Sequence, residues 1–262
     1  MKTAYELVKG ARSKDRQTGM DFINNVFTGF IELHGDRRFA DDPSVVAGLA
    51  LLGDMPFTVI ATEKGRDLKN RMHRNFGMAN PEGYRKAMRL MKQAEKFQRP
   101  VVCFIDTCGA FPGIGAEERG QGQAIAESIM EMMALKTPIL TVLIGEGGSG
   151  GALALAVANE VWMLENAIYS VIAPESCANI LWRDPDKAAE AAENLKLTAQ
   201  DVYANGVVER IISEKGGDAE RLFASLKSDI LAWHHKMKEK TSGELTQERY
   251  DRFRRLGIPK EN

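Results

Sequence analysis

The sequence has almost no net charge, no long apolar run, and few cysteines or histidines. Among its 262 residues, 35 Lys and Arg balance 36 Asp and Glu, so the formal net charge at pH 7 is −1. This balance argues against partners held by a global field, such as nucleic acid or an anionic membrane. No run of about 18 apolar residues occurs, and the charged segment 1–21 lacks an apolar signal core. We therefore expect neither a secreted nor a membrane-spanning protein.

The scarcity of cysteine and histidine excludes several kinds of catalytic site. Cys103, Cys108 and Cys177 are odd in number and far apart, and no CxxC pair suggests a zinc site or a redox dithiol. This use of cysteine favours a reducing compartment, the cytoplasm. No histidine lies between His73 and His234, so a histidine base is missing from the middle of the chain.

Apolar periodicity predicts an α/β fold in which helices and strands alternate. The expected strands cover 45–52, 58–62, 101–106, 139–144, 161–164, 169–172 and 207–212, with a hairpin turn at 53–56. The expected helices cover most of 1–35, with a break between Gly10 and Gly19, and then 87–97, 116–135, 152–158, 175–182, 188–194 and 218–238. The alternation indicates parallel strand-helix-strand units. We divide the chain into an N-terminal helical segment, 1–35, and one main domain with C-terminal helices, 36–262.

A glycine-rich turn after the strand predicted at 139–144 is the strongest candidate for a site. Glycine occupies positions 145, 147, 148, 150 and 151, interrupted only by Glu146 and Ser149, and a helix of small residues follows. Glycine lets a ligand approach the backbone closely, and the first NH groups of a helix are unpaired donors. The strand predicted at 101–106 ends in a similar turn around Gly109. Parallel strands bring both turns to one edge of the sheet.

Three functional interpretations of this turn are open, beside a structural one in which the glycines only allow tight packing. As GxGxxG, the turn follows a strand, and Glu165 stands where a dinucleotide site needs an acid. As GxSxG, residues 147–151 place Ser149 at an elbow suited to a nucleophile, but no histidine base is near in sequence. As an oxyanion hole, the backbone NH groups act while a substrate or cofactor supplies the reacting groups. Only the last interpretation explains both the glycines and the missing histidines.

Several motifs in a consistent order resemble the carboxyltransferase α subunits of bacterial acetyl-CoA carboxylase. The matching runs are 64–66 (KGR), 74–78 (RNFGM), 81–86 (PEGYRK), 115–121 (GAEERGQ), 144–153 (IGEGGSGGAL) and 169–172 (YSVI), and the resemblance extends over residues 24–255. It implies a crotonase-like fold, a superhelix of stacked ββα units with peripheral N- and C-terminal helices.

The resemblance also implies an activity and its partners. Members of this family transfer the carboxyl group of carboxybiotin, held on the biotin carboxyl carrier protein, to acetyl-CoA, and so form malonyl-CoA, the first committed step of fatty acid synthesis. They act only with a β subunit, as an α2β2 heterotetramer, and work beside biotin carboxylase. Zinc is expected only in the β subunit, and neither a metal in this chain nor a membrane or nucleic-acid partner is expected. Protein NH groups stabilise the ureido oxyanion of biotin in this chemistry.

The same resemblance assigns residues to the site. The backbone oxyanion hole is expected at Gly147, Gly148, Gly150 and Gly151, completed by Gly109 and Ala110. Cofactor contacts are expected from Lys64, Arg66, Arg74 and Phe111, although the basic run 64–74 is equally typical of a solvated helix face. The chain departs from the family's common pattern at Cys108, Phe111 and the loop 214–218. Cys108 is either a reactive thiol or a small buried filler.

Overall fold

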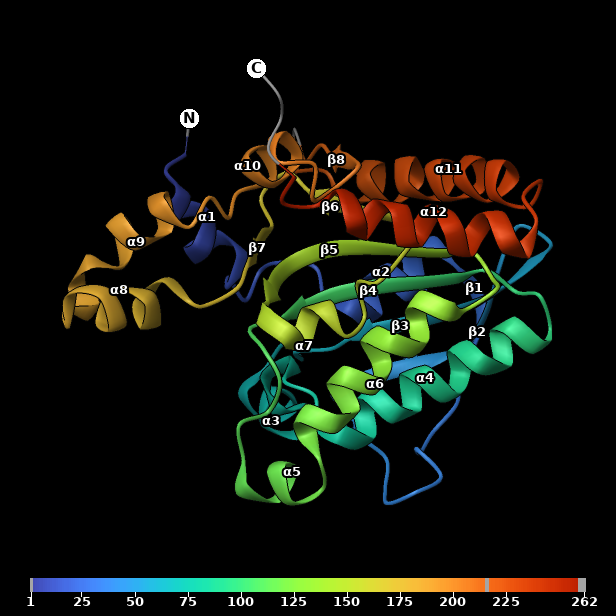
Figure 1. Cartoon of the computed structure of the whole chain (residues 1–262), viewed down its shortest axis with the longest axis horizontal. Coiled ribbons are helices and arrows are strands. Elements are labelled where there is room, and N and C mark those ends of the chain that lie inside the picture. Colours follow the sequence, from blue (N-terminus) through green and yellow to red (C-terminus); the bar gives the residue numbers. More distant parts are fainter. Residues whose placement is uncertain (1, 215–216, 259–262) are drawn as a thin grey trace.

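The computed structural model describes residues 2–214 and 217–258, in which eight strands form one sheet with helices on both faces (Figure 1). The strand order is β1-β2-β3-β4-β5-β6-β8, and β7 pairs with β5 off this path. Pairing is antiparallel from β1 to β3 and parallel from β3 to β8. The strands are β1 (Thr28–Glu32), β2 (Val45–Leu52), β3 (Met55–Thr62), β4 (Val101–Thr107), β5 (Ile139–Gly148), β6 (Glu160–Leu164), β7 (Ile168–Ser170) and β8 (Arg210–Ile212).

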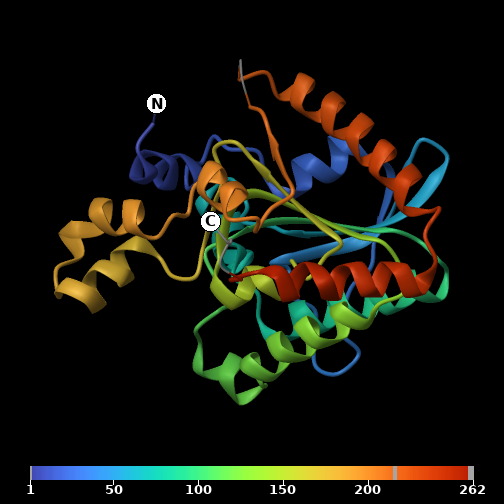
Figure 2. The same ribbon diagram turned by 45° about the horizontal axis from the view of Figure 1, so that its top comes forward.

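Two helical layers enclose the sheet, as Figures 1 and 2 show from two directions. On one face, α2 (Gly19–Val26) lies on the sheet and α11 (Ala219–Met237) lies on α2. Phe22 of α2 joins these layers, since its ring centroid is 5.3 Å from that of Phe104 in β4 and 5.2 Å from that of Phe223 in α11. Burial of these aromatic rings is a large part of the hydrophobic stabilisation on this face.

The opposite face is covered by α4 (Pro81–Lys96), which packs on β2 and β3, and by α6 (Gln121–Ala134) beside it. The C-terminal helix α12 (Ser242–Arg255) packs against α6. A separate group of helices, α1 (Ala4–Ala11), α8 (Pro174–Trp182) and α9 (Ala188–Asn194), lies to one side of the sheet, at the left of Figure 1. The short helices are α3 (Leu68–His73), α5 (Ile114–Glu118), α7 (Ser149–Leu153) and α10 (Ala199–Ala204), with 3-10 turns at Asn75–Gly77 and Pro185–Lys187.

The long strand β5 contains a bulge that positions the glycine turn. Its first half pairs with β6, and its last residues, Glu146 to Gly148, pair with β7. Against β4, the register shifts between the pairs Ile105↔Leu143 and Thr107↔Gly147, so Asp106 alone faces residues 144–146. Bulges of this kind bend a strand and redirect its side chains. The glycine run therefore begins inside the sheet and not after it.

Many of the predicted elements are confirmed, including the parallel sheet and its alternation with helices. The strand predicted at 45–52 is β2, and the hairpin turn after it narrows to Gly53 and Asp54 because β3 already begins at Met55. The helices predicted at 188–194 and 218–238 are α9 and α11, the latter with Asp218 as its N-cap. Strong local periodicity was sufficient for these elements.

Other predicted elements are wrong in extent or type. Residues 28–32 form the edge strand β1 and not the end of a helix, because pairing with β2 satisfies their backbone. The helix predicted at 116–135 is split at Gly120, whose φ of +82° is left-handed. The helix predicted at 152–158 covers 149–153, and β5 continues to Gly148 instead of ending at 144. Helices α3, α10 and α12 were not predicted. In the loop 214–218, residues 215 and 216 lie outside the described residues.

Arg249 of α12 is fully buried and caps the end of α6. Its guanidinium donates to the carbonyl oxygens of Met132 (2.6 Å), Leu135 (2.8 Å) and Thr137 (3.0 Å) and to Asn159 Oδ1 (2.7 Å). The last carbonyls of a helix need such donors, and a cation there is favoured by the helix dipole. Burial lowers the pKa of Arg249 to about 10. One side chain thus fastens the C-terminal helix to the sheet layer.

No helix among the described residues is long and apolar enough to cross a membrane.

Replacing Arg249 by Met should lower the free energy of unfolding by about 3 kcal/mol, because several buried carbonyls lose their donor. Urea unfolding of the purified chain, followed by circular dichroism, measures this. Arg254→Met is the matched control, since Arg254 is exposed on the same helix, and it should change stability by less than about 0.5 kcal/mol. Equal losses in the two variants would contradict the capping role.

Candidate active site

The two glycine turns predicted to share a sheet edge are in direct contact. A Cβ atom on Gly148 would lie 2.1 Å from the carbonyl oxygen of Cys108, and one on Gly151 would lie 2.5 Å from the amide nitrogen of Ala110. Neither position can hold a side chain, because real Cβ atoms do not approach backbone atoms so closely. The structure therefore brings Gly109 and Ala110 against Gly148 and Gly151.

The other two glycines of the predicted hole differ in their surroundings. Gly147 lies within β5 opposite Tyr169, and a Cβ there would meet the Tyr169 ring at 2.8 Å, so its glycine serves packing. At Gly150 the nearest atom to an added Cβ is Ile125 Cγ2, at 3.6 Å, which is ordinary contact. A side chain at Gly150 would therefore meet only ordinary contact at its Cβ and would cause no backbone strain.

Backbone donors are available where the turns meet. Among the described residues, the Ala110 NH has no hydrogen-bond acceptor, whereas the Gly109 NH donates to Thr107 Oγ1 at 3.2 Å. The helix α7 is a single turn, and the first NH groups of a helix have no partner within it. Free NH groups where two turns meet suit a small anionic oxygen.

An apolar cavity of about 420 Å³ opens beside Gly150. Its polar margin includes Ser149, Ser170, Lys196 and Asn205. Apolar side chains and one aromatic ring form the rest of its wall: Leu153, Tyr169, Val171, Leu195, Val202 and Val207. An apolar pocket with a few polar groups beside free NH donors is typical of a site for an organic cofactor or substrate.

A buried charge network supports the glycine turn from beneath. Lys64 Nζ lies 2.6 Å from Asp106 Oδ1 and 2.8 Å from Glu146 Oε2. The backbone NH of Glu146 donates to Asp106 Oδ1 at 2.7 Å, and the Asp106 carboxylate covers Gly145, where a Cβ would be 2.2 Å from it. Arg12 of the N-terminal segment donates to Glu146 Oε1 at 2.8 Å. The bulge in β5 is thus held by paired charges.

Protonation states follow from this pairing. Burial disfavours a charged Lys64, but the carboxylates of Asp106 and Glu146 outweigh it and raise the pKa of Lys64. Burial also works against a charged Glu146, yet Lys64 and Arg12 hold the pKa of Glu146 below its usual value. Lys64 and Glu146 therefore stay charged at neutral pH, and their charges largely cancel next to the turn.

Of the four residues predicted to contact the cofactor, two lie at the glycine turns and two do not. Lys64 joins it through Glu146, whereas Arg66 pairs with Asp21 at 2.5 Å and Arg74 donates to the Pro43 carbonyl at 2.7 Å. Phe111 is half-buried in the first turn, where its carbonyl accepts from Gln121 Nε2 at 2.9 Å. The structure therefore brings Lys64 and Phe111 to the two turns, while Arg66 and Arg74 have their contacts elsewhere.

Cys108 is exposed, so its interpretation as a buried filler is wrong. Partial burial and the nearby Glu146 raise the pKa of its thiol, which keeps the reactive thiolate scarce at neutral pH.

Sequence reasoning missed the residues that hold the turn in place: Arg12, Asp106 and Glu146. The available signal was Glu146 itself, a carboxylate among five glycines at the end of a buried strand, which requires a counter-ion. Its partners Lys64 and Arg12 are 82 and 134 residues away in the chain. Only the folded chain identifies them.

The serine and dinucleotide interpretations lack their further requirements. Ser149 is exposed and has the positive φ, +52°, of a nucleophile elbow. His234, a candidate base for this serine, is instead buried against Phe57 in the core. Glu165, the acid of the dinucleotide pattern, accepts instead from Ser213 Oγ and the backbone NH of Glu214, both at 3.1 Å.

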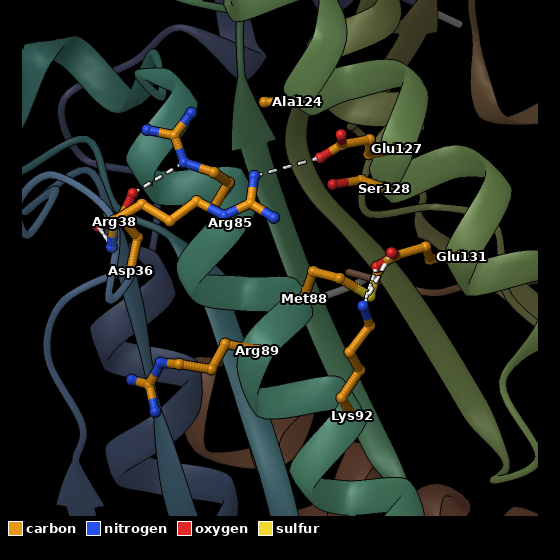
Figure 3. Close-up of a pocket in the computed structure, with 10 residues that line it drawn as sticks. All are labelled: Asp36, Arg38, Arg85, Met88, Arg89, Lys92, Ala124, Glu127, Ser128 and Glu131. Atoms are coloured by element: carbon orange, nitrogen blue, oxygen red, sulfur yellow. Dashed lines mark hydrogen bonds and ion pairs between the residues drawn. The ribbon is translucent and has the colours of Figure 1, made fainter. Parts of the chain in front are cut away.

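A separate hollow of about 170 Å³ lies between α4 and α6 (Figure 3). Its charges pair among themselves: Arg85 with Asp36 at 2.8 Å, Lys92 with Glu131 at 2.7 Å and Arg38 with Glu127 at 3.7 Å. No glycine of the two turns lines it. It is a charge-compensated helix interface and not part of the candidate site.

Known structures share this fold. Transcarboxylase 12S, solved with methylmalonyl-CoA and methylmalonic acid bound, matches with a TM-score of 0.72 and 18% identity, over 90% of this chain and 44% of that chain. The geranyl-CoA carboxylase β subunit of P. aeruginosa matches with a TM-score of 0.65 and 17% identity, over 86% of this chain and 44% of that chain. Both are carboxyltransferase structures, and the predicted crotonase-like fold is confirmed.

Known sequences are far more similar. The family described as acetyl co-enzyme A carboxylase carboxyltransferase-like matches residues 2–257. An acetyl-CoA carboxylase carboxyl transferase α subunit of Ruminiclostridium cellulolyticum is 62% identical over 256 residues, 98% of each chain. One of Streptococcus equi subsp. zooepidemicus is 53% identical, over 97% of this chain and 100% of its own. In Natranaerobius thermophilus a similar sequence, 53% identical, forms 43% of a protein named as the β/α subunits together, and covers 97% of this chain. The motifs, the fold and the sequence over nearly the whole chain all match this family. The chain therefore belongs to the family of acetyl-CoA carboxylase carboxyltransferase α subunits.

Proposed function

We propose that this chain forms the carboxybiotin half of the carboxyltransferase site, and that the meeting point of its two glycine turns is the oxyanion hole for biotin. The observation that carries the proposal is the free Ala110 NH, placed against Gly151 at the start of α7. NH groups aimed at developing negative charge stabilise a transition state. Gly109, Gly148 and Gly151 let the two turns approach closely enough for their donors to converge, and Gly147 packs the strand behind them.

Carboxyl transfer from biotin requires few catalytic side chains from this chain. Carboxybiotin, once bound, would supply both the carboxyl group and the base that the transfer requires. The chain's own residues bind and orient the ureido ring, which fits the apolar cavity beside Gly150. This division of labour agrees with a site that has glycines and NH donors but no histidine.

The charge network makes this anion site possible. Two carboxylates, Asp106 and Glu146, lie at the base of the turn and would repel an oxyanion if they were unpaired. Lys64 and Arg12 compensate them. In this role Lys64 acts on the cofactor through Glu146, and Arg66, Arg74 and Phe111 are left as candidates for outer contacts with the carrier-bound cofactor or CoA.

The partners follow from the family. The α subunit acts with a β subunit, and we propose an α2β2 heterotetramer in which the β chain binds acetyl-CoA and holds the zinc. The relative that carries both subunits in one protein supports the pairing of α with β. We further propose that the biotin carboxyl carrier protein delivers carboxybiotin from biotin carboxylase, and that the assembly works in the cytoplasm, where free Cys103, Cys108 and Cys177 stay reduced.

A transfer assay tests the proposal directly. The purified chain with its β subunit should carboxylate biocytin from malonyl-CoA, and neither chain should do so alone, because each holds half of the site. Formation of acetyl-CoA, measured by a coupled enzyme, gives the rate. Hydration or hydrolysis of an enoyl-CoA by the isolated chain would instead reveal a self-sufficient crotonase-type enzyme, and β binding without transfer would reveal a scaffold.

Two neighbouring substitutions separate an oxyanion hole from a serine nucleophile. Gly150→Val should lower the transfer rate by at least about a hundredfold, because its side chain enters the cavity beside the donors and not the backbone behind them. Ser149→Ala should keep most of the rate. β binding and the thermal midpoint, measured for both variants, report on folding. Loss of transfer in Ser149→Ala alone would favour the nucleophile.

Lys64→Met should lower the free energy of unfolding by about 3–5 kcal/mol near neutral pH, because it leaves Asp106 and Glu146 buried without their shared cation. In the native chain the lowered pKa of Glu146 contributes stability above its unfolded value, near 4.5, which is lost as pH falls through the folded pKa. Without Lys64, burial should raise the pKa of Glu146, so the deficit should shrink as the pH falls from neutral toward 4.5.

Urea unfolding at several pH values measures this deficit. Lys92→Met is the matched control, since Lys92 forms an exposed ion pair with Glu131 at 2.7 Å, and should cost less than about 1 kcal/mol at any pH. A deficit that stays constant with pH would refute the neutralising role of Lys64.

A further inference from the structure

Tyr84 is a buried polar residue that the proposed site does not yet use. It lies on α4, is fully buried, and belongs to none of the contacts described above between the two turns and the charge network. Within residues 2–214 and 217–258, its hydroxyl has no hydrogen-bond partner. Burial raises the pKa of Tyr84 above that of a free phenol, so the hydroxyl keeps its proton and remains a donor.

The hydroxyl is aimed at the point where the two turns meet. Tyr84 Oη lies 2.9 Å from the position that a Cβ on Gly151 would take. The same position is 2.5 Å from the Ala110 nitrogen and 2.6 Å from the Gly109 carbonyl carbon. The phenol, the Gly109–Ala110 peptide and Gly151 therefore border one small space, which exists only because residue 151 has no side chain.

An unpartnered hydroxyl in this space costs stability that phenylalanine would avoid. Phenylalanine has the same ring and would fill the same volume, whereas a buried donor without an acceptor loses its hydration and gains nothing in return. Buried polar groups without partners are rare in proteins, and each requires an explanation. The explanation is a partner that is present only in another state of the site.

The Gly109–Ala110 peptide can supply that partner. Its NH, at Ala110, is the free donor of the proposed oxyanion hole, and its carbonyl points the opposite way because the peptide is planar and trans. Nothing lies within 4 Å of the Cβ position at Gly109, and its φ of +153° is open to glycine. The carbonyl now accepts only from the nearby Thr107 hydroxyl at 2.7 Å. On the side of the Gly109 Cβ position, therefore, no atom obstructs the peptide.

We propose that Tyr84 is a positioning residue for the oxyanion hole, and that its hydroxyl donates to the Gly109 carbonyl when an oxyanion draws the Ala110 NH toward itself. The hydrogen bond forms behind the peptide as the charge develops in front of it. Tyr84 then fixes the orientation of the Ala110 donor in the charged state alone. This inference rests on the proposed function, since it names a residue that serves the same oxyanion.

The test uses the assembled α and β subunits and biocytin as the carboxyl acceptor. Tyr84→Phe should lower kcat for transfer from malonyl-CoA by at least about tenfold, since a misdirected donor fails mainly in the transition state. KM for biocytin should stay within about twofold, because the neutral ureido group gains little from the Tyr84 contact. The thermal midpoint should equal or exceed that of the unaltered chain, because an unpartnered hydroxyl has been removed.

Tyr250→Phe is the matched control, since Tyr250 is exposed on α12, and it should leave kcat, KM and the midpoint unchanged. An unchanged kcat in Tyr84→Phe would overturn the proposal, as would a lower midpoint, which would mean that the hydroxyl already has a partner in the empty protein. If the unaltered assembly transfers no carboxyl group, the proposed function fails. The midpoint comparison then still decides whether the Tyr84 hydroxyl is unpartnered.

Discussion

The ion pairs of Lys64 with Asp106 and Glu146 are the interactions on which the site depends. They fill the bulge of β5 with compensated charge, and the Asp106 carboxylate occupies the space above Gly145. Buried charges are tolerated only when paired and hydrogen-bonded, so the geometry of the bulge and the pairing determine each other. Arg12 extends the network to Glu175 at 2.7 Å, and so links α1, the glycine turn and α8. These ion pairs hold the glycine turn in one conformation.

The glycines of the turn have different physical roles, although they look alike in sequence. Gly145 makes room for a carboxylate, Gly147 for an aromatic ring, and Gly148 and Gly151 for the backbone of the neighbouring turn. Of these five glycines, Gly150 has the most room, since the nearest atom to a Cβ there is 3.6 Å away. Close packing explains most of the run, and the same packing brings the free Ala110 NH against Gly151. The structural and functional interpretations of the glycines are therefore two aspects of one arrangement.

The proposed site of backbone donors would suit a chain that shares its active centre with a partner. Backbone NH groups need no proton exchange and no adjacent base, so the reacting groups can come from cofactor and substrate on other chains. The family to which the chain belongs, and the relative that joins β and α in one protein, agree with such a shared centre. The buried Tyr84 hydroxyl indicates that the empty chain is not at its stability optimum here, as is common at functional sites.

The sequence by itself determined the elements with strong local periodicity and the place of the glycine turns. Strand β2, helices α9 and α11, the parallel order and the family could all be inferred, because alternation, helical spacing and motif order are properties of neighbouring residues. The edge strand β1 and the helix α12 could not be inferred in this way. Strand β1 depends on β2 for its backbone hydrogen bonds, and α12 is held by Arg249, which bonds to carbonyl oxygens at the end of α6. Only the tertiary structure decided which residues support the turn. Lys64, Asp106, Glu146 and Arg12 become neighbours only in the folded chain, where their charges interact at close range.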